Sequence, residues 1–188
     1  MTSDAAAPSD FKSALLKEIP KLRFFALSLA GQQDRADDLV QEALIKAWAA
    51  QDRFTPGTSL RAWLFTILRN VFYSEYRKRR REVPDTDGEE AARLFSNPEQ
   101  NGHLDLGDLK AALATLPEDQ REALLLVGAA GVSYEEAAQV CGCAVGTIKS
   151  RVNRARKRLL ALLGVDSASE FGGDYLAVNG ASAPLELA

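Results

Sequence analysis

The sequence predicts an all-α protein made of two small helical domains joined by an acidic linker. Apolar residues recur three or four positions apart through most of the chain, which is the spacing of one helix face. No stretch shows the strict alternation of a half-buried strand. Residues 82–107 lack sustained periodicity and contain two prolines and three glycines, so we expect a flexible linker there that can include one helical turn near residues 89–95.

The first half of the chain predicts three helices. The first runs from residue 11 to residue 30; Pro20 stands where a helix could restart, so this helix can be interrupted near Glu18. The second is the stretch "DRADDLVQEALIKAW", with Asp34 as its expected N-cap. The third follows the turn "FTPGTS", with Thr58 or Ser59 as its cap, and runs from residue 60 to about residue 80.

The second half predicts four helices. One spans residues 108–116, and the next begins at Pro117 and stops in the glycine-containing region 128–131. The third carries a capping box, in which Ser133 is followed three residues later by Glu136. Gly142 suits the left-handed position after that helix, and the last helix keeps an apolar stripe up to Gly164.

Charge is distributed unevenly along the chain. The net charge is only -3, which argues against a generic nucleic-acid binder. However, residues 77–81 read "RKRRR" and residues 149–158 are also strongly basic, while residues 82–108 hold eight acids against the single base Arg93. Two basic sites are therefore separated by an acidic spacer.

No segment predicts insertion into a membrane. No apolar run approaches the length that spans a bilayer, and the start "MTSDAAAPSD" carries acids instead of the basic and apolar regions of a signal peptide. We therefore expect a cytoplasmic protein.

The sequence predicts neither a metal nor a cofactor site. Cys141 and Cys143 are separated by one residue, so a disulfide between them would be strained, and the only histidine, His103, lies in another segment. No paired acid–base group or cofactor loop indicates an enzyme or a small-molecule substrate.

The stretch "GCAVGTIKSRVNRARKRL", residues 142–159, predicts the second helix of a helix-turn-helix. Such a unit places the beginning of its second helix in the major groove of DNA. The alternative is a helical hairpin with a merely solvated basic face, but no acid occurs from residue 137 to residue 165 to form pairs along it. We expect DNA contacts from the residues outside the apolar stripe: Gly146, Thr147, Lys149, Ser150, Asn153 and Arg154.

Three stretches together resemble one protein family. "DRADDLVQEALIKAW" is followed by "GTSLRAWLFTILRNVFYSEYRKRRR" and, after the acidic linker, by "LPEDQREALLLVGAAGVSYEEAAQVCGCAVGTIKSRVNRARKRL". In this order and spacing they resemble the extracytoplasmic-function RNA polymerase sigma factors of the sigma-70 family, over residues 10–163. "FALSLAG", "DLVQEALIKAW" and "LRNVFYSEYRKRR" resemble in particular the EcfG-like subgroup that runs the general stress response.

The resemblance implies a domain organisation and a function. Residues 10–81 would be region 2, residues 82–107 the linker, residues 108–164 region 4 with its helix-turn-helix, and residues 165–188 a flexible tail. The protein would bind core RNA polymerase, recognise and melt promoter DNA, and be held in check by an anti-sigma factor. The acidic linker would pass through the basic interior of the polymerase.

The resemblance also implies roles for individual residues. The last helix would read the minus-thirty-five element; the preference there does not transfer, since Val127 and Gly128 stand where some relatives carry a basic residue. Polymerase contacts fall on the polar face of one helix, at Asp37, Asp38, Gln41 and Glu42. Minus-ten contacts fall on Trp63, Asn70, Arg77, Lys78, Arg79 and Arg80.

Several of these residues also allow a purely structural role, and the whole chain allows other functions. The polar face at residues 37–42 could be an ordinary solvated helix surface, and Trp63 could be a core aromatic. The whole chain could be a sigma-like decoy that binds an anti-sigma factor, or a dimeric repressor. A decoy usually carries an attached phosphoreceiver domain and a weakened reading helix, which this chain lacks, and a repressor would leave the first domain without a purpose.

Overall fold

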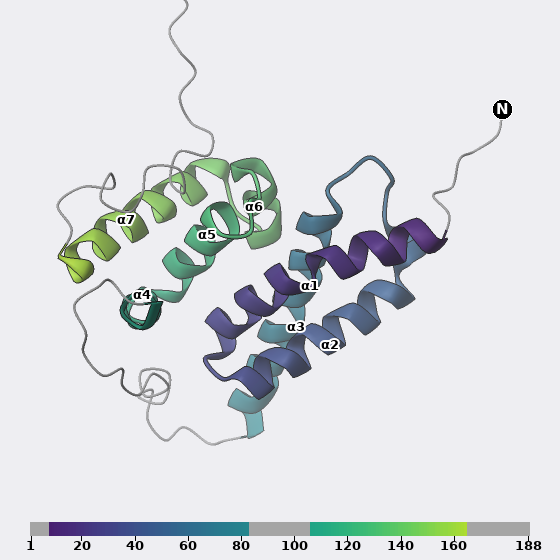
Figure 1. Cartoon of the computed structure of the whole chain (residues 1–188), viewed down its shortest axis with the longest axis horizontal. Coiled ribbons are helices and arrows are strands. Elements are labelled where there is room, and N and C mark those ends of the chain that lie inside the picture. Colours follow the sequence, from purple (N-terminus) through teal and green to yellow (C-terminus); the bar gives the residue numbers. More distant parts are fainter. Residues whose placement is uncertain (1–7, 83–105, 165–188) are drawn as a thin grey trace, which may run out of the picture.

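The computed structural model describes residues 8–82 and 106–164, and all regular structure in them is helical. The expected linker and tail lie outside these residues, apart from the linker's first residue and its last two. Helices α1 (Pro8–Ala30), α2 (Gln33–Ala49) and α3 (Leu60–Glu82) form one group, with the short 3-10 helix η1 (Gln51–Arg53) after α2. Helices α4 (Leu106–Ala114), α5 (Glu118–Gly128), α6 (Tyr134–Cys141) and α7 (Val145–Leu163) form the second (Figure 1). The all-α prediction is confirmed for the described part of the chain.

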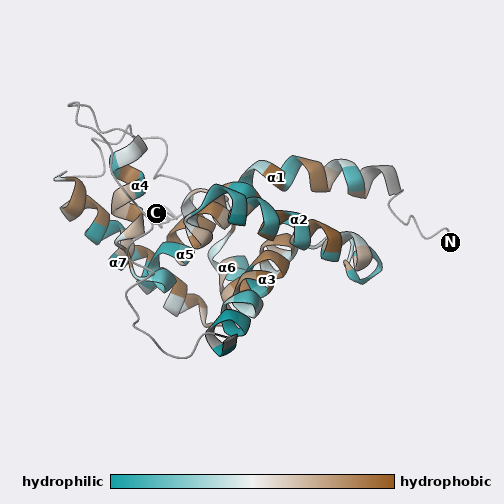
Figure 2. Cartoon of the chain, turned by 90° about the horizontal axis from the view of Figure 1, so that it is seen from below, coloured by the Kyte–Doolittle hydropathy of each residue, from teal (hydrophilic) through white to brown (hydrophobic). Residues whose placement is uncertain are grey.

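The first group, α1 to α3, is held together by its apolar stripes. Leu22, Leu39 and Leu68 are almost completely buried, each from a different helix. The rings of Phe25 and Phe65 meet edge to face with centroids 5.0 Å apart. Figure 2 shows hydrophobic and hydrophilic residues alternating along these helices, as expected where one face packs and the other is solvated.

Two sequence expectations for the first group are wrong in detail. Helix α1 continues through Pro20 without the interruption expected near Glu18. Pro20 is exposed, so the carbonyl that lost its partner faces water and the packed side of α1 is undisturbed. The N-cap of α2 is Gln32 and not Asp34, so the helix begins at Gln33. Asp34 lies in the first turn, where its negative charge interacts favourably with the helix dipole.

Capping residues fix the helices of the second group as the sequence predicted. Ser133 Oγ accepts a hydrogen bond from the backbone of Glu136 at 3.1 Å, and Glu136 Oε2 accepts one from the backbone of Ser133 at 2.8 Å. Gly142 ends α6 with φ +64°, in the left-handed region that favours glycine. In the first group, Ser59 caps α3 by accepting from the backbone of Ala62. The turn between α6 and α7 is therefore set by local chemistry.

The two groups of helices pack against each other. Helix α3 lies against α6, and α1 lies against α5. One hydrophobic cluster runs through both groups, from Leu22 and Phe65 in the first to Leu126 and Ile148 in the second. The domains that the sequence separates by a linker are thus in direct contact.

Gly142 ends the first helix of the helix-turn-helix and Gly146 lies in the first turn of the second. Substitution by alanine should change the free energy of unfolding in opposite directions at these two positions. No atom lies within 4 Å of a Cβ built at Gly142 or Gly146, so backbone conformation alone decides each effect. Gly142→Ala should cost about 1 kcal/mol because of its positive φ, whereas Gly146→Ala, inside α7, should stabilise by up to about 1 kcal/mol. Urea unfolding measures both; equal effects would contradict the left-handed geometry at residue 142.

Candidate nucleic-acid interface

Helix α7 presents its predicted DNA-reading residues away from the core. Ile148, Val152 and Ala155 are buried and anchor the helix. On its other side Gly146, Lys149, Asn153 and Arg154 are exposed, while Thr147 and Ser150 are half-buried. The six residues share one outward face at the beginning of the helix, which is the part that a helix-turn-helix inserts into DNA.

Some side chains on this face are already oriented by neighbours. The hydroxyl of Ser150 donates to the carbonyl of Thr147 at 2.9 Å, and Arg154 Nη2 lies 3.4 Å from Ser150 Oγ. The ammonium of Lys149 lies 5.9 Å from the ring centroid of Tyr134, at the start of α6. The contact of Arg154 is long and exposed, whereas the bond of Ser150 is short and partly buried.

The two cysteines flank the turn before α7. Both are free thiols: Cys141 is buried and burial raises its pKa to about 12, so it is unreactive at neutral pH. Cys143 is half-buried, and Arg151 Nη1 lies 3.8 Å from its sulfur. Within residues 8–82 and 106–164, no three His, Cys, Asp or Glu side chains are grouped to hold a metal ion.

The second predicted DNA surface is the basic end of α3, the run of five basic residues from Arg77 to Arg81, with Arg77, Lys78, Arg79 and Arg80 as the expected contacts. Arg77, Lys78 and Arg81 line a shallow open hollow together with Ser74. Arg79 instead pairs with Glu75 one turn earlier, at 3.2 Å. The side chain of Arg80 is outside the described set.

Trp63 and Asn70, also predicted to face the minus-ten element, lie in different surroundings. Trp63 is half-buried in an aromatic cluster, where its ring centroid lies 5.5 Å from that of Phe54 and 6.3 Å from that of Phe11. Asn70 is exposed in the middle of α3. The structure thus groups the basic end of α3 but sets Trp63 apart, near the other end of that helix.

The predicted polymerase surface lies at a shallow groove between α1 and α2. Asp37 and Gln41 line the groove with Ile19, Leu44 and Ile45. Asp37 accepts from Arg23 of α1 at 2.8 Å, and this hydrogen bond, helped by one from Gln33, holds the pKa of Asp37 below its usual value. Asp38 is exposed on the same helix, and Glu42 pairs with Lys46 at 2.6 Å.

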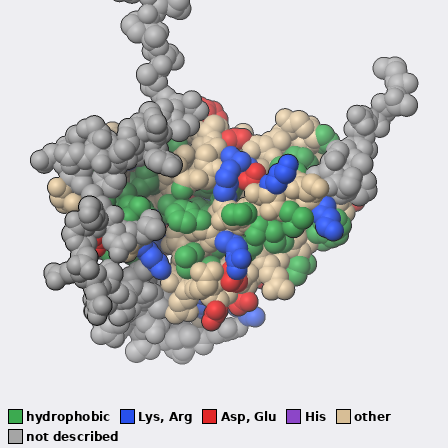
Figure 3. Space-filling model, viewed as in Figure 1, with side chains coloured by type: hydrophobic (Ala, Val, Ile, Leu, Met, Phe, Trp, Pro, Cys, Tyr) green, Lys and Arg blue, Asp and Glu red, His purple; other side chains and the backbone are tan. Residues whose placement is uncertain are grey.

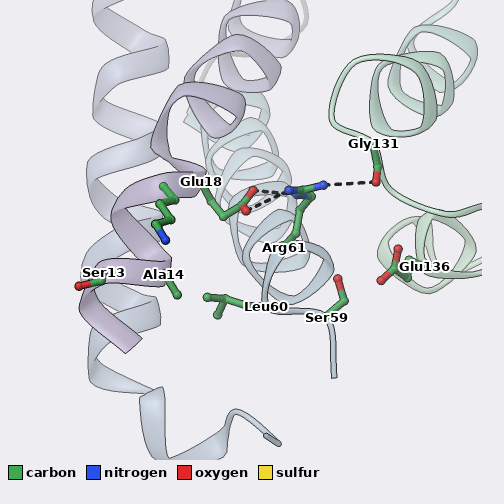
Figure 4. Close-up of a pocket in the computed structure, with 9 residues that line it drawn as sticks. Ser13, Ala14, Glu18, Ser59, Leu60, Arg61, Gly131 and Glu136 are labelled. Carbon is green, nitrogen blue, oxygen red and sulfur yellow. Dashed lines mark hydrogen bonds and ion pairs between the residues drawn. The ribbon is translucent and has the colours of Figure 1, made fainter. Parts of the chain in front are cut away.

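Sequence reasoning missed a set of charged residues that joins the two groups of helices. Arg61 of α3 donates to both carboxylate oxygens of Glu18 in α1, at 2.8 and 3.1 Å. It also donates to the carbonyl of Gly131, before α6, at 3.3 Å. Figure 4 shows Arg61 between these two partners, with Glu136 of α6 facing Ser59 at the start of α3.

A second arginine of α3 makes the more buried link. Arg69 Nε donates to Glu122 of α5 at 2.6 Å, and the Glu122 side chain is only 1% exposed. Burial raises the pKa of Glu122, against the opposing influence of Arg69. Tyr73 lies beside the pair: the Arg69 guanidinium is 4.6 Å from its ring centroid, and burial, together with Glu122 and Glu118, raises the pKa of its hydroxyl. The one sequence signal for this contact was the position of Glu122, an acid that directly precedes the apolar run "ALLLV".

These features define a helical protein with a helix-turn-helix and a second basic helix. Comparison with known families agrees: residues 15–82 match the model of sigma-70 region 2, and residues 106–159 match that of sigma-70 region 4. The extracytoplasmic-function (ECF) RNA polymerase sigma factor EcfG of Rhodopseudomonas palustris is 64% identical over 160 residues, which cover 85% of this chain and 88% of that protein.

Solved structures give the same result. The sigma factor RpoE of Bartonella quintana, crystallised with the anti-sigma factor NepR, is 55% identical, with a TM-score of 0.71 over 84% of this chain and 99% of that one. CnrH, solved with the cytosolic domain of CnrY, is 32% identical, with a TM-score of 0.62 over 87% of this chain and 93% of that one.

The chain therefore belongs to the ECF sigma factors of the sigma-70 family, in the EcfG-like group. It is a transcription initiation factor that binds core RNA polymerase and promoter DNA. None of the described helices is long and apolar enough to cross a membrane.

The bond between Glu18 and Arg61 should make stability depend on pH. The hydrogen bond from Arg61 lowers the pKa of Glu18 below its ordinary 4.5, so the folded chain favours the carboxylate. This stabilisation is present above pH 4.5 and is lost as the pH falls through the lowered pKa. Glu18→Gln should cost about 1 kcal/mol at pH 7, after discounting for partial exposure, and less at lower pH.

Urea unfolding at several pH values between 3 and 7 measures the difference between the two proteins. A constant difference across that range would show that the charge of Glu18 does not contribute.

Proposed function

We propose that this sigma factor reads a promoter with two separate surfaces, α7 and the outer face of α3, while the groove between α1 and α2 binds the polymerase. The observation that carries the proposal is the outward face of α7, which has no acidic residue and projects from a helix-turn-helix. The second basic surface, on α3, supports the proposal, because a protein that bound DNA through α7 alone would not need it.

Helix α7 would read the minus-thirty-five element in the major groove. Lys149 and Arg154 can donate to guanine or phosphate oxygens, and Asn153 can both donate and accept. Thr147 and Ser150 add short polar side chains near the start of the helix, and Gly146 leaves room for a close approach of the backbone. The later charges, Lys157 and Arg158, are exposed and would lie near phosphates.

The outer face of α3 would bind the minus-ten element. Arg77, Lys78, Arg79 and Arg80 would follow the duplex backbone and add affinity that falls with salt. Asn70 would contact a base that has left the stack. Trp63 would act from the aromatic cluster beside the loop "FTPGTS", where a ring edge can support an unpaired base.

The α1–α2 groove suits a helical partner. It has an apolar floor with Ile19, Val40 and Leu44, and a polar rim with Asp37 and Gln41. Ile45 beside it is 62% exposed, which is unusual for a large aliphatic side chain. Figure 3 shows hydrophobic side chains on the described surface with charged ones around them. Asp38 and Glu42 would complete the polymerase contact.

Promoter binding requires the two reading helices to separate. Elements centred at minus ten and minus thirty-five are roughly 25 base pairs apart, or about 85 Å along the duplex at 34–36 Å per turn. In this structure the groups that carry the two helices touch through α3 and α6. The closed arrangement would therefore be the form away from the promoter, and the boundaries expected at residues 81 and 108 mark where the units part.

An anti-sigma factor would hold the protein in check. The similar Bartonella quintana sigma factor was crystallised with the anti-sigma factor NepR. Similarity to EcfG supports control of stress genes. The protein would act in the cytoplasm, where promoter DNA lies, and would have no catalytic activity of its own, since the polymerase supplies the chemistry.

Run-off transcription tests the proposal. Core polymerase with this protein should transcribe a subset of a promoter library that core polymerase alone leaves silent. If no promoter gains transcripts while a purified anti-sigma factor binds tightly, the chain is a decoy and not a promoter reader.

The same assay tests the reading face of α7. Arg154→Ala should lower transcription roughly 5- to 150-fold from promoters that depend on their upstream element, since a good base contact contributes about 1–3 kcal/mol. Arg158→Ala, from the same helix, is the matched control and should weaken all promoters to a similar, smaller extent. Unchanged output from Arg154→Ala would remove this residue from the reading face.

A further inference from the structure

The contact between α3 and α5 covers residues that continue the proposed DNA-binding face of α3. Arg69, Tyr73 and Arg77 are four residues apart, so they form one row along the helix. Asn70 lies beside this row, three residues before Tyr73. Arg77 is exposed, whereas Arg69 and Tyr73 are half-buried against α5.

The partners of the covered residues are both carboxylates. Arg69 Nε donates to Glu122 Oε1 at 2.6 Å, and Arg69 Nη2 lies 3.4 Å from Glu122 Oε2. Burial and the nearby acids Glu122 and Glu118 raise the pKa of the Tyr73 hydroxyl, so Glu118 lies near this side chain. Glu118 and Glu122 are four residues apart on α5, the same spacing as Arg69 and Tyr73 on α3.

A guanidinium that grips a carboxylate with two nitrogens can grip a phosphate in the same way. Arg69 is also held over the Tyr73 ring at 4.6 Å, which orients its fork independently of Glu122. A purely structural contact would not need this charge, because well-packed apolar residues serve as well or better than a buried ion pair. The charge has a use if Arg69 has a second anionic partner.

We propose that Arg69 and Tyr73 are DNA-contacting residues of α3, and that Glu122 and Glu118 occupy them in the closed arrangement. The α5 carboxylates take the place of the DNA phosphates, so closing of the two groups and DNA binding compete for the same side chains. The inference rests on the proposed function in one respect, that α3 faces DNA. It adds that the carboxylates of α5 compete with DNA for the side chains of α3.

The experiment compares variants of the full chain that break the same ion pair from opposite sides. The probe is a fluorescein-labelled duplex of random sequence, because phosphate contacts do not depend on sequence. Fluorescence anisotropy measures its dissociation constant between 50 and 300 mM KCl. The variants are Glu122→Gln, Arg69→Gln, the double variant Arg69→Gln/Glu122→Gln, and the charge exchange Arg69→Glu/Glu122→Arg.

Glu122→Gln should bind the duplex at least threefold more tightly, because it releases Arg69. Its salt dependence should steepen by about 0.9 in the slope of log K against log salt, the effect of one additional phosphate contact. Arg69→Gln also breaks the ion pair, yet it should gain nothing, and the double variant should match it. The charge exchange should bind no more tightly than wild type.

Two further variants guard against simpler explanations. Asp34→Asn, on α2, changes the net charge as Glu122→Gln does and should leave the affinity unchanged. Glu118→Gln changes an exposed residue, so folding is safe, and it should give a smaller gain in the same direction. Circular dichroism checks that each variant is folded.

Equal gains from Glu122→Gln and Arg69→Gln would overturn the proposal, because the contact would then be a latch without a DNA-binding role. An unchanged affinity for both Glu122→Gln and Glu118→Gln would also overturn it. Run-off transcription by the wild-type protein tests the promoter function separately. The binding assay can therefore exclude the competition while transcription supports promoter recognition, and it can support the competition while transcription excludes promoter recognition.

Discussion

The arrangement of this molecule depends on the buried ion pair between Arg69 and Glu122. A carboxylate that is 1% exposed must have a partner, since an unpaired charge in that position would cost several kcal/mol. Glu122 keeps both its burial and its partner because α5 reaches α3 at Arg69. Arg61 acts in the same sense, with Glu18 on one side and the carbonyl of Gly131 on the other. The packing of α3 against α6 and of α1 against α5 surrounds these charged links.

Such contacts suit a protein that has to open. Charged pairs are specific in geometry but contribute little net stability, because the desolvation of the charges offsets much of their attraction. They fix one closed arrangement without making it permanent. If core polymerase and promoter DNA bind the parted arrangement, as proposed above, their binding energy can shift the population towards it.

Much of the architecture could be predicted from the sequence because local chemistry decides it. The capping box at Ser133, the left-handed Gly142 and the apolar stripe of α7 each act within a few residues. The N-cap of α2 was predicted at Asp34 but lies two residues earlier, at Gln32, because the helical pattern alone does not fix where a helix begins. The interruption expected at Pro20 failed because an exposed proline leaves the packed side of a helix intact.

The candidate sites divide in a similar way. Residues on the outward face of α7 follow from its periodicity, and the basic end of α3 follows from its charge. The links from Arg61 and Arg69 join residues 43 and 53 positions apart, and no local pattern specifies such partners. The one sequence hint of a distant cation was the acid Glu122 at the start of the apolar run "ALLLV". Trp63 shows the opposite difficulty, since its aromatic surroundings fit either a core or a binding platform.

The most direct test of the account is the distance between the two groups of helices in the free protein and on a promoter. Fluorescent non-natural amino acids at the exposed positions Leu16, on α1, and Gln139, on α6, would report it by energy transfer without replacing either cysteine. The account predicts efficient transfer in the free chain and its loss in the complex with core polymerase and promoter DNA. Efficient transfer in both states would contradict it, because two groups of helices in contact cannot read elements about 85 Å apart.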